Sequence, residues 1–394
     1  MGKLRRHKAV YSFLRFTLSP LLRRLLRFKG EPVKPDFNCL VLANHNTDWD
    51  PLLCATAVKA HMYFVASEHI FRWGLISRII VHLVDPIARP KGSSALQTIK
   101  EIRKRLGLGT NVMMFAEGNR SWNGETGFIS PATGKLAKAT GCGLITYRLS
   151  GGYFASPRWA ENRRKGPILG HIAGIYSPEQ LKNMSVDEVN RAISQDLYEN
   201  AYELQQKQMI PYRSKRPAEF LERVLYMCPS CKRLLSLKSS GSNFSCSCGY
   251  SVKINDFGFF EAKDGAPVFD NIYDWDMWQK AELFSLADKY SSSGIKDPFI
   301  CMPDEGLFLI HQKADSVLLA RSTMNIYADR LEMVNGDEAY TFLYSSISGM
   351  AVNGKGTLVF TADDGKYYEL KNTRPRCALL YNILFRHFSG REYI

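Results

Sequence analysis

The stretch CLVLANHNTDWDP, residues 39–51, decides how the first half of the chain folds. Its first five residues are apolar and form a run of the length expected for a strand buried on both faces. Polar residues follow at once, and Pro51 favours the first turn of a helix, which makes Asp50 the expected N-cap. A strand, a loop and a helix in this order are the repeating unit of an α/β domain.

The same alternation extends over some 140 residues around this stretch. Three further apolar runs predict buried strands, at Met62–Ala66, Val112–Phe115 and Gly143–Leu149. An amphipathic helix is expected at Ser93–Leu106, and the glycines that follow it predict a helix C-cap rather than a dinucleotide-binding loop. A polar helix is expected from Ser185 to about Gln208, opened by a capping box.

Composition and charge narrow the class of protein. The 394 residues are 45% hydrophobic, which suffices for two or three domains and excludes a mainly disordered chain. The net charge is +14, and ten basic residues but only one acidic residue lie among the first 35. No apolar run is long enough to cross a bilayer, and arginines interrupt any secretory signal. Nine cysteines, four of them clustered, do not fit a disulfide scaffold, so we expect a reducing, cytosolic environment.

The basic N-terminal segment has an amphipathic pattern. Residues 10–28 mix Leu and Phe with Arg, and Pro20 predicts two short helices rather than one. Five leucines are expected to share one side, namely Leu18, Leu21, Leu22, Leu25 and Leu26. Such a segment is typical of helices that lie on an anionic membrane, and the alternative is a surface helix packed on its own domain. We expect a peripheral protein at the cytoplasmic face of the cell membrane.

A histidine follows the first predicted strand, where sites of α/β domains are usually found. His45 lies in the loop after the strand, with Asp50 and Asp48 as rival partners. A carboxylate bonded to one ring nitrogen fixes the tautomer, and the other nitrogen then acts as a base. Taken alone, this spacing is a weak signal.

Two other segments place cations at the ends of predicted strands. In FAEGNRS, residues 115–121, Gly118 allows close approach of the backbone to a ligand and Arg120 offers a fork suited to phosphate. An ordinary polar turn is the alternative. In DPIAR, residues 85–89, Arg89 ends a short extended run, and a lone arginine is usually just a solvated charge.

In this order, the segments resemble the glycerolipid acyltransferase family, and within it the bacterial 1-acyl-sn-glycerol-3-phosphate acyltransferases. The pattern is N-H-x4-D, an Arg-bearing segment, F-x-E-G-x-R and an apolar strand, and it covers about residues 35–205. GLITYR, residues 143–148, replaces the family's proline-containing fourth block, which leaves the choice of acceptor open to another lysophospholipid or hydroxylated lipid.

The resemblance implies transfer of an acyl group from acyl-CoA or acyl-carrier protein to 1-acyl-sn-glycerol 3-phosphate, which gives phosphatidate. It implies that His45 is the general base and Asp50 its orienting partner. It places the acceptor's binding site at Asn44, Arg89, Glu117, Gly118 and Arg120. A thioester is already activated, and the absence of G-x-S-x-G is consistent with direct attack and no catalytic cofactor. Surface cations are expected to attract either anionic donor, among them Lys100, Arg103 and Lys104.

Four cysteines form a second motif. They are Cys228, Cys231, Cys246 and Cys248, a C-x2-C pair and a C-x-C pair separated by 14 residues. The spacing resembles a zinc ribbon, although the second pair departs from C-x2-C, and it predicts a structural zinc ion. Four unpaired core thiols are the alternative. A full set of cysteine ligands leaves no open position for catalysis.

The last third of the chain predicts a small sheet. After a helix near Trp275–Tyr290, residues 299–371 contain short alternating runs, and an apolar helix at about Pro375–Phe388 closes the chain. This order is similar to pleckstrin-homology-like domains, which would make the region a lipid or protein docking module. A stabilising appendage is the alternative.

We therefore expect four parts. They are a membrane-associating segment (1–34), an α/β acyltransferase domain (35–210), a linker helix with a zinc-ribbon-like module (211–255) and a C-terminal α+β domain (256–394). A zinc-ribbon nucleic-acid-binding protein with an inactive acyltransferase-like domain is the alternative of a different class. Most of the positive charge lies beside Leu and Phe, so we expect an anionic membrane and no nucleic acid as partner.

Overall fold

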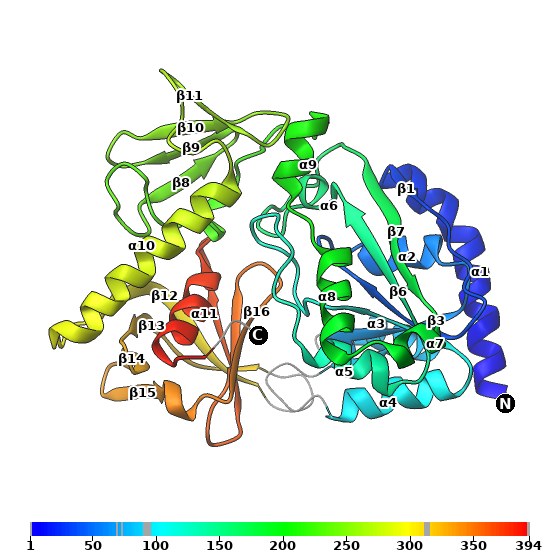
Figure 1. Cartoon of the computed structure of the whole chain (residues 1–394). Coiled ribbons are helices and arrows are strands. Elements are labelled where there is room, and N and C mark those ends of the chain that lie inside the picture. The colour runs from blue at the N-terminus through cyan, green and yellow to red at the C-terminus, as the bar shows by residue number, and fades with distance from the viewer. Residues whose placement is uncertain (1, 68–69, 72–73, 90–95, 311–315, 392–394) are drawn as a thin grey trace.

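The computed structural model describes residues 2–67, 70–71, 74–89, 96–310 and 316–391 of the chain. Three β-sheets organise it, and Figure 1 shows them as an N-terminal α/β body, a small four-stranded sheet and a C-terminal β body. The long helix α10 (Ile272–Ser293) runs from the small sheet along the C-terminal body. The predicted α/β domain followed by a mainly β C-terminal region is present.

The first sheet has seven strands in the order β1-β7-β6-β2-β5-β3-β4. The five strands β2, β3, β4, β5 and β6 run parallel to one another, whereas β7 runs antiparallel to β6. The strands are β1 (Phe28–Gly30), β2 (Cys39–Ala43), β3 (Met62–Ser67), β4 (Ile87–Arg89), β5 (Asn111–Phe115), β6 (Gly143–Ser150) and β7 (Ile168–Tyr176). All four predicted strands are present, and the fully buried β2 lies at the centre.

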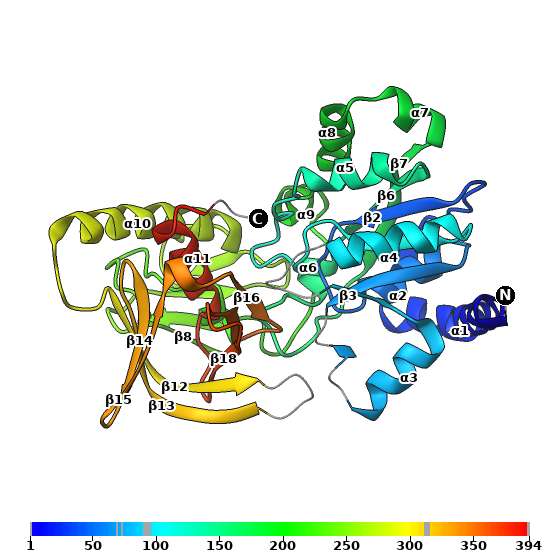
Figure 2. The same cartoon turned by 90° about the horizontal axis from the view of Figure 1, so that it is seen from below.

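Helices cover both faces of this sheet (Figure 2). Cys39, Val41 and Ala43 of β2 belong to the core formed with the helices on one face, whereas Leu40 and Leu42 belong to the core on the other. The helices of the first face are α1 (Gly2–Leu25), α2 (Asp50–Ala57) and α3 (Leu75–Val84). Those of the second are α4 (Leu96–Gly107), α5 (Ala132–Ala139), α7 (Pro178–Asn183) and α8 (Val186–Leu197). This alternation explains why β2 reads as a continuous apolar run.

The N-terminal segment forms one helix, so the prediction of two pieces divided at Pro20 is wrong. Proline removes one helical hydrogen bond, but α1 is held from outside because it packs against α2 and α3. The predicted apolar side is itself divided. Leu22 and Leu26 are buried in the core, whereas Leu18, Leu21 and Leu25 are exposed. Among the described residues, no helix has both the length and the apolar character needed to cross a membrane.

Two other predicted helices differ in their ends. The capping box at Ser185 is present, but the helix it opens ends at Leu197, and a separate helix α9 (Ala201–Gln208) follows. The predicted single helix is therefore wrong: Tyr198 and Asn200 have extended backbone, and residues 199–201 form backbone hydrogen bonds and a bridge with residues 124–126. Helix α4 begins at Leu96, and the predicted start at Ser93 lies outside the described residues.

The small sheet carries the four clustered cysteines. It is antiparallel in the order β11-β10-β9-β8, and its strands are β8 (Leu237–Ser240), β9 (Asn243–Cys246), β10 (Ser251–Ile254) and β11 (Phe260–Ala262). β11 lies beyond the predicted boundary at residue 255. The expected linker helix is absent from residues 211–236, all of which are described and which contain only the 3-10 turn Leu221–Arg223. Pro211 and Pro217 interrupt that segment, and Leu225 is buried from irregular backbone.

The C-terminal body is one antiparallel sheet closed by a helix. Its seven strands have the order β15-β14-β13-β12-β18-β17-β16. They are β12 (Ile300–Ile310), β13 (Ser316–Ile326), β14 (Arg330–Asn335), β15 (Glu338–Leu343), β16 (Gly349–Asn353), β17 (Thr357–Thr361) and β18 (Tyr367–Asn372). The final helix α11 (Ala378–Phe388) packs on β16 and β17, as the strand-then-helix pattern predicts. The likeness to pleckstrin-homology-like domains remains a prediction.

Candidate active site

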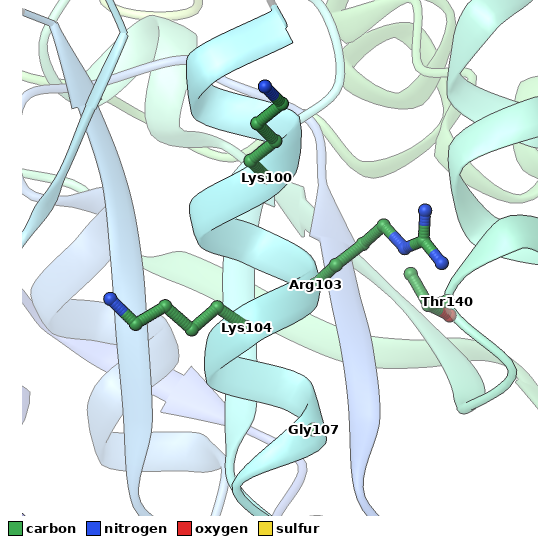
Figure 3. A pocket seen from close by; sticks show the side chains of 5 residues that line it. All are labelled: Lys100, Arg103, Lys104, Gly107 and Thr140. Carbon is green, nitrogen blue, oxygen red and sulfur yellow. The ribbon is translucent and has the colours of Figure 1, made fainter.

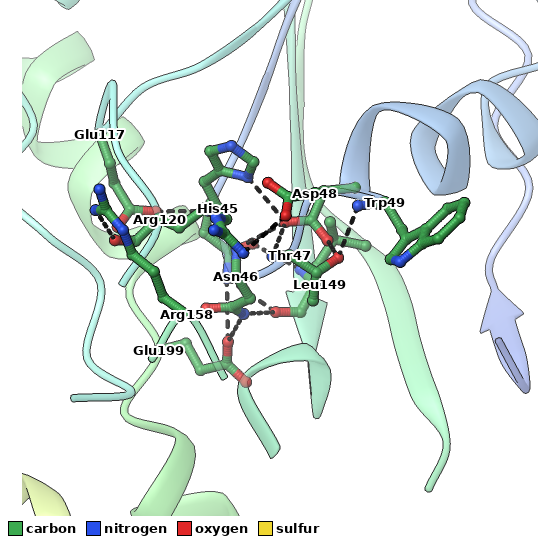
Figure 4. A network of polar contacts seen from close by, with 12 residues as sticks. His45, Asn46, Thr47, Asp48, Trp49, Glu117, Arg120, Leu149, Arg158 and Glu199 are labelled. Atoms are coloured by element: carbon green, nitrogen blue, oxygen red, sulfur yellow. Dashed lines mark hydrogen bonds and ion pairs between the residues drawn. The ribbon is translucent and has the colours of Figure 1, made fainter. Parts of the chain in front are cut away.

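The predicted site residues gather mainly at the carboxyl edge of the first sheet. β2 and β5 are parallel neighbours, so the loops that follow them begin side by side. We call residues 116–125, which follow β5, the Arg120 loop. A backbone hydrogen bond of 3.0 Å from Ser121 N to His45 O joins the two loops directly. Figure 4 shows how their side chains converge.

His45 and Asp50 are paired. Nδ1 of His45 lies 3.0 Å from Oδ2 of Asp50, and the imidazole stacks on Phe115 with 4.1 Å between ring centroids. The His45 side chain is 19% exposed, and its Nε2 has no hydrogen-bond partner among the described residues. A carboxylate on Nδ1 favours the tautomer with the proton on Nδ1 and leaves the Nε2 lone pair available. The geometry is that of a histidine base.

Asp50 is fully buried and bonded on both oxygens. Oδ2 accepts hydrogen bonds from the backbone nitrogens of Asn46 and Thr47, each at 2.7 Å, and Oδ1 accepts one from the Thr47 hydroxyl at 2.6 Å. The expectation that Asp50 is the N-cap is wrong by one residue, since α2 begins at Asp50 and Trp49 precedes it. The difference has a physical reason: the Asp50 carboxylate folds back onto the preceding loop instead of bonding forward to the helix.

Asp48, the rival partner of His45, is engaged elsewhere. Its Oδ2 lies 3.1 Å from Nη1 of Arg120. Asp48 is 73% exposed and Arg120 only 8%, so the arginine is fixed within the protein while its anionic partner faces solvent. The arrangement holds a mostly buried guanidinium next to the histidine loop with its anionic ion-pair partner, Asp48, facing solvent.

Glu117 was expected to bind substrate, but it faces the backbone. Its Oε1 accepts a hydrogen bond from His45 N and its Oε2 one from Gly127 N, both at 2.6 Å. Burial raises the pKa of Glu117 to about 8. Both carboxyl oxygens are thus engaged by backbone nitrogens, and the residue holds the His45 loop in place. A role of Glu117 in substrate binding stays a prediction. Gly118 has φ of +67°, which explains the glycine at this turn.

Asn44 is likewise engaged within the protein, because it is fully buried and both ends of its amide are hydrogen-bonded. Its Oδ1 accepts from Leu149 N at 2.7 Å, and its Nδ2 donates to Leu149 O at 2.8 Å and to Glu199 Oε2 at 3.0 Å. The side chain thus ties the end of β2 to β6. Substrate binding by Asn44 stays a prediction.

Two residues of the site, Glu199 and Arg158, were not predicted from the sequence. Glu199 lies between α8 and α9, is buried, and also accepts from Asn46 Nδ2 at 3.0 Å. Burial raises the pKa of Glu199 to about 7. Arg158 is buried beside Arg120 and bonds to its backbone carbonyl. Nothing in their local sequence sets them apart, since both reach the site only through the tertiary fold.

Two predicted groups of cations lie farther off. Arg89 ends β4, at the outer edge of the sheet and two strands away from β5, although at the same carboxyl edge. Lys100, Arg103 and Lys104 line an open pocket with Gly107 and Thr140 (Figure 3). The last turn of α4 leads into the amino end of β5, so this pocket lies toward the edge of the sheet opposite His45.

The four predicted zinc ligands come together. Their sulfur atoms all lie within 4.8 Å of one another, with Cys228 and Cys248 3.7 Å apart and Cys231 and Cys246 3.8 Å apart. Four sulfurs bound to zinc at about 2.3 Å in a tetrahedron are about 3.8 Å apart, so the cluster fits that metal. Cys228 and Cys246 are buried, and Cys231 and Cys248 are exposed.

Comparison with known proteins identifies one part of the chain. Residues 26–150 match the sequence model of the family described as Acyltransferase. Among solved structures, the 1-acyl-sn-glycerophosphate (LPA) acyltransferase PlsC from Thermotoga maritima is similar at 19% identity, over 50% of this chain and 81% of that one, with a TM-score of 0.42. A chain of the 8S snRNP assembly intermediate is similar at 12% identity, over 24% of this chain and 84% of that one, with a TM-score of 0.20. No curated protein matches the chain.

The matched stretch runs through the strands from β1 to β6 and includes His45, Asp50, Arg89 and the whole Arg120 loop. It contains every active-site residue that the sequence predicted. Residues 26–150 therefore match the acyltransferase family, as the resemblance found in the sequence predicts.

Proposed function

We propose that the protein acylates 1-acyl-sn-glycerol 3-phosphate, with acyl-CoA or acyl-carrier protein as donor, and so forms phosphatidate. The observation that carries the proposal is the His45–Asp50 pair beside a fixed guanidinium, inside the stretch that matches the acyltransferase family. A base next to a phosphate-binding cation suits an acceptor whose free hydroxyl lies near a phosphate.

In the proposed reaction, His45 Nε2 takes the proton of the acceptor hydroxyl as its oxygen attacks the thioester carbonyl carbon. The tetrahedral intermediate collapses, the carbon–sulfur bond breaks, and the imidazolium returns the proton to the departing thiolate. The buried Asp50 carboxylate stabilises the imidazolium and keeps the ring oriented. A histidine base of this kind contributes about 10²–10⁴-fold to the rate.

The acceptor phosphate is proposed to bind Arg120 where Asp48 now contacts it. Arg120 is 8% exposed, so its fork is already ordered before the ligand arrives, which reduces the entropy lost on binding. Arg89 lies on the same edge of the sheet and adds positive charge there. Glu117 and Asn44 hold the two loops.

The protein is further proposed to work at the cytoplasmic face of an anionic membrane. On α1, Phe13 is 65% and Phe16 is 83% exposed, and on the adjacent α3, Leu75 is 72% and Ile79 57% exposed. Exposed cations lie on the same first helix, namely Arg5, Arg6, Lys8, Arg23 and Arg24. Apolar side chains that enter the headgroup region and cations that meet anionic lipid together support peripheral attachment.

The cysteine cluster is proposed to hold a structural zinc ion. The sulfur separations fit a tetrahedral site, and the same four thiols connect the turn before β8 with the turn after β9. Zinc with four thiolates would supply folding energy to a sheet too small to form a large core.

An acyl-transfer assay tests the proposed reaction. Purified protein is incubated in mixed micelles with lysophosphatidate and either donor, and phosphatidate is measured. We expect product from the wild type and a loss of at least about 100-fold in His45→Ala. His171→Ala is the control, because His171 is a half-buried histidine of β7 bonded to Arg148. Undiminished activity in His45→Ala contradicts the mechanism, and product only from other lysophospholipids favours the alternative acceptor.

A further inference from the structure

The Arg120 loop is one of the places where the C-terminal half of the chain meets the acyltransferase domain. The loop packs between two elements from outside the region matched by the family: α10 and the hairpin formed by β16 and β17. Helix α10 bonds to Asn123, three positions after Arg120. The hairpin bonds to Arg158, which in turn bonds to the Arg120 carbonyl.

Arg158 connects the loop to the hairpin. Its Nη1 donates to Arg120 O at 3.1 Å, its Nη2 to Val352 O at 2.7 Å, and its Nε to Gly354 O at 3.0 Å. The guanidinium also lies over the Trp122 ring, 4.1 Å from the centroid. One buried, planar side chain therefore contacts the loop twice and the hairpin twice, a geometry that a lysine cannot reproduce.

Helix α10 holds the other side of the loop. Asn123 Nδ2 donates to Oδ2 of Asp276 at 2.8 Å, and the Tyr273 hydroxyl lies 3.2 Å from Glu125 Oε1. Asp276 is fully buried, and its carboxylate also contacts Lys280 and Gln279 of the same helix. The helix thus presents a carboxylate fixed on three sides to the loop that carries Arg120.

These contacts bear on anion binding because of the charges involved. Burial, with Arg120 nearby, lowers the pKa of Arg158 to about 9. The two hairpin carbonyl oxygens compensate part of the cost of burying this charge only while the two halves stay together. When the halves separate, Arg158 keeps its bond to Arg120 O but loses both hairpin partners, so its guanidinium no longer ties the loop to the hairpin. The position of Arg120 is therefore linked to the docking of the C-terminal half.

We infer that Arg158 and Asp276 are positioning residues through which the C-terminal half holds the Arg120 loop in its anion-binding position. The C-terminal half then completes the acceptor site without touching the acceptor. This inference rests on the proposed function for its kinetic consequence, although the contacts themselves are independent of the reaction.

The kinetic test compares two buried arginines in the full-length protein. Arg158→Lys is expected to raise KM for lysophosphatidate by about tenfold or more, with KM for the acyl donor changed less than about twofold. Arg164→Lys is the matched control, because Arg164 is also buried, stacks over a tryptophan, Trp159, and donates to a carbonyl, that of Pro217. Among the described residues, no hydrogen bond, ion pair or ring contact joins the Arg164 side chain to the Arg120 loop. Equal effects of the two substitutions on both KM values overturn the inference.

A swap of polar groups tests Asp276 without emptying the site. Asn123→Asp places a second carboxylate against Asp276 and is expected to raise KM for lysophosphatidate, because the hydrogen bond becomes a repulsion. Adding Asp276→Asn restores a donor and an acceptor in reversed order. The double variant is expected to reverse at least half of the increase in KM. If the double variant is no better than Asn123→Asp alone, Asp276 does not position the loop.

Amide hydrogen exchange separates this inference from the proposed reaction. Residues 119–125 are expected to exchange faster in Arg158→Lys and in Asn123→Asp than in the wild type and Arg164→Lys, with the strands β2 and β5 unchanged. If the wild type makes no phosphatidate but the exchange pattern holds, the proposed function fails and the positioning role stands. If the wild type is active but neither exchange nor KM distinguishes Arg158→Lys from its control, the positioning role fails.

Discussion

Oε2 of Glu199 accepts a hydrogen bond from Nδ2 of Asn44 at 3.0 Å, although 155 positions separate the two residues. The same oxygen accepts one from Asn46 Nδ2, so a single buried carboxylate holds the residues on either side of His45. The base of the proposed reaction is thus oriented from both sides, by Asp50 on its ring and by Glu199 through its neighbours.

This buried acid makes stability depend on pH. Burial raises the pKa of Glu199 to about 7, so between its ordinary value and pH 7 the folded protein keeps a proton that the unfolded chain releases. The stability that this proton contributes is full below the unfolded value and is lost as the pH rises through about 7. In the wild type, the free energy of unfolding should therefore decrease between pH 5 and pH 8. We expect this decrease to be smaller by about 1–3 kcal/mol in Glu199→Gln.

Urea unfolding at several pH values measures this slope. Glu203→Gln is the control, because Glu203 is an exposed acid in the first turn of α9. The two variants should differ only in the pH dependence. Parallel curves for wild type and Glu199→Gln would show that the carboxyl is already ionised at pH 5.

Asp48 is expected to compete with the acceptor phosphate for Arg120. Its carboxylate is 73% exposed and contacts Nη1 at 3.1 Å, so binding of a phosphate displaces it. An exposed ion pair is worth about 0.2–1 kcal/mol, and Asp48→Asn should therefore lower KM for lysophosphatidate by up to about fivefold. Initial rates at varied acceptor concentration measure the effect. A rise in KM would show that Asp48 helps to hold Arg120 rather than competing for it.

Removal of the metal is expected to disturb the active site from a distance. Trp275 belongs to the core that includes Phe244 and Phe260 of the cysteine-bearing sheet, and it immediately precedes Asp276 on α10. We expect about one zinc ion per chain. Its chelation should lower the midpoint of the lowest-temperature unfolding transition by more than ~5 °C and should raise KM for lysophosphatidate.

Metal analysis and a serine variant check this prediction. Cys248→Ser should lose zinc and reproduce the effects of chelation, whereas Cys301→Ser, at an exposed cysteine outside the cluster, should keep both metal and activity. Zinc-free protein with an unchanged unfolding temperature would contradict a structural role for the metal.

Membrane attachment is expected to depend on the exposed phenylalanines of α1. Replacing both Phe13 and Phe16 by Ser removes side chains whose burial contributes about 1.5–3 kcal/mol each, so binding to anionic vesicles should fall by at least tenfold. Leu343→Ser, at an exposed apolar residue of the C-terminal sheet, is the control. Sedimentation with vesicles that contain phosphatidylglycerol gives the measurement, and equal binding of both variants would place the contact elsewhere.

Local pattern sufficed for the elements of the α/β domain. The run Cys39–Ala43 is apolar at every position because both faces of β2 are covered, and such runs identify buried strands without further information. The start of the helix at Ser185 was equally readable, since its capping box is formed by residues three apart. The predicted division of the first helix at Pro20 was wrong, because packing against neighbouring helices outweighs one missing hydrogen bond.

The sequence by itself determined which reactive groups are available. They are a histidine and an aspartate five positions apart after β2, an arginine after β5, and four thiols at metal-ligand spacing. These signals are local, because each motif needs residue types at short separations. Only the tertiary structure decided which groups face a ligand and which hold others in place. It turned Glu117 and Asn44 inward and brought in Glu199, Arg158 and Asp276 from distant segments. Burial and hydrogen-bond partners arise from the packing of whole layers, and no single stretch of the chain contains that information.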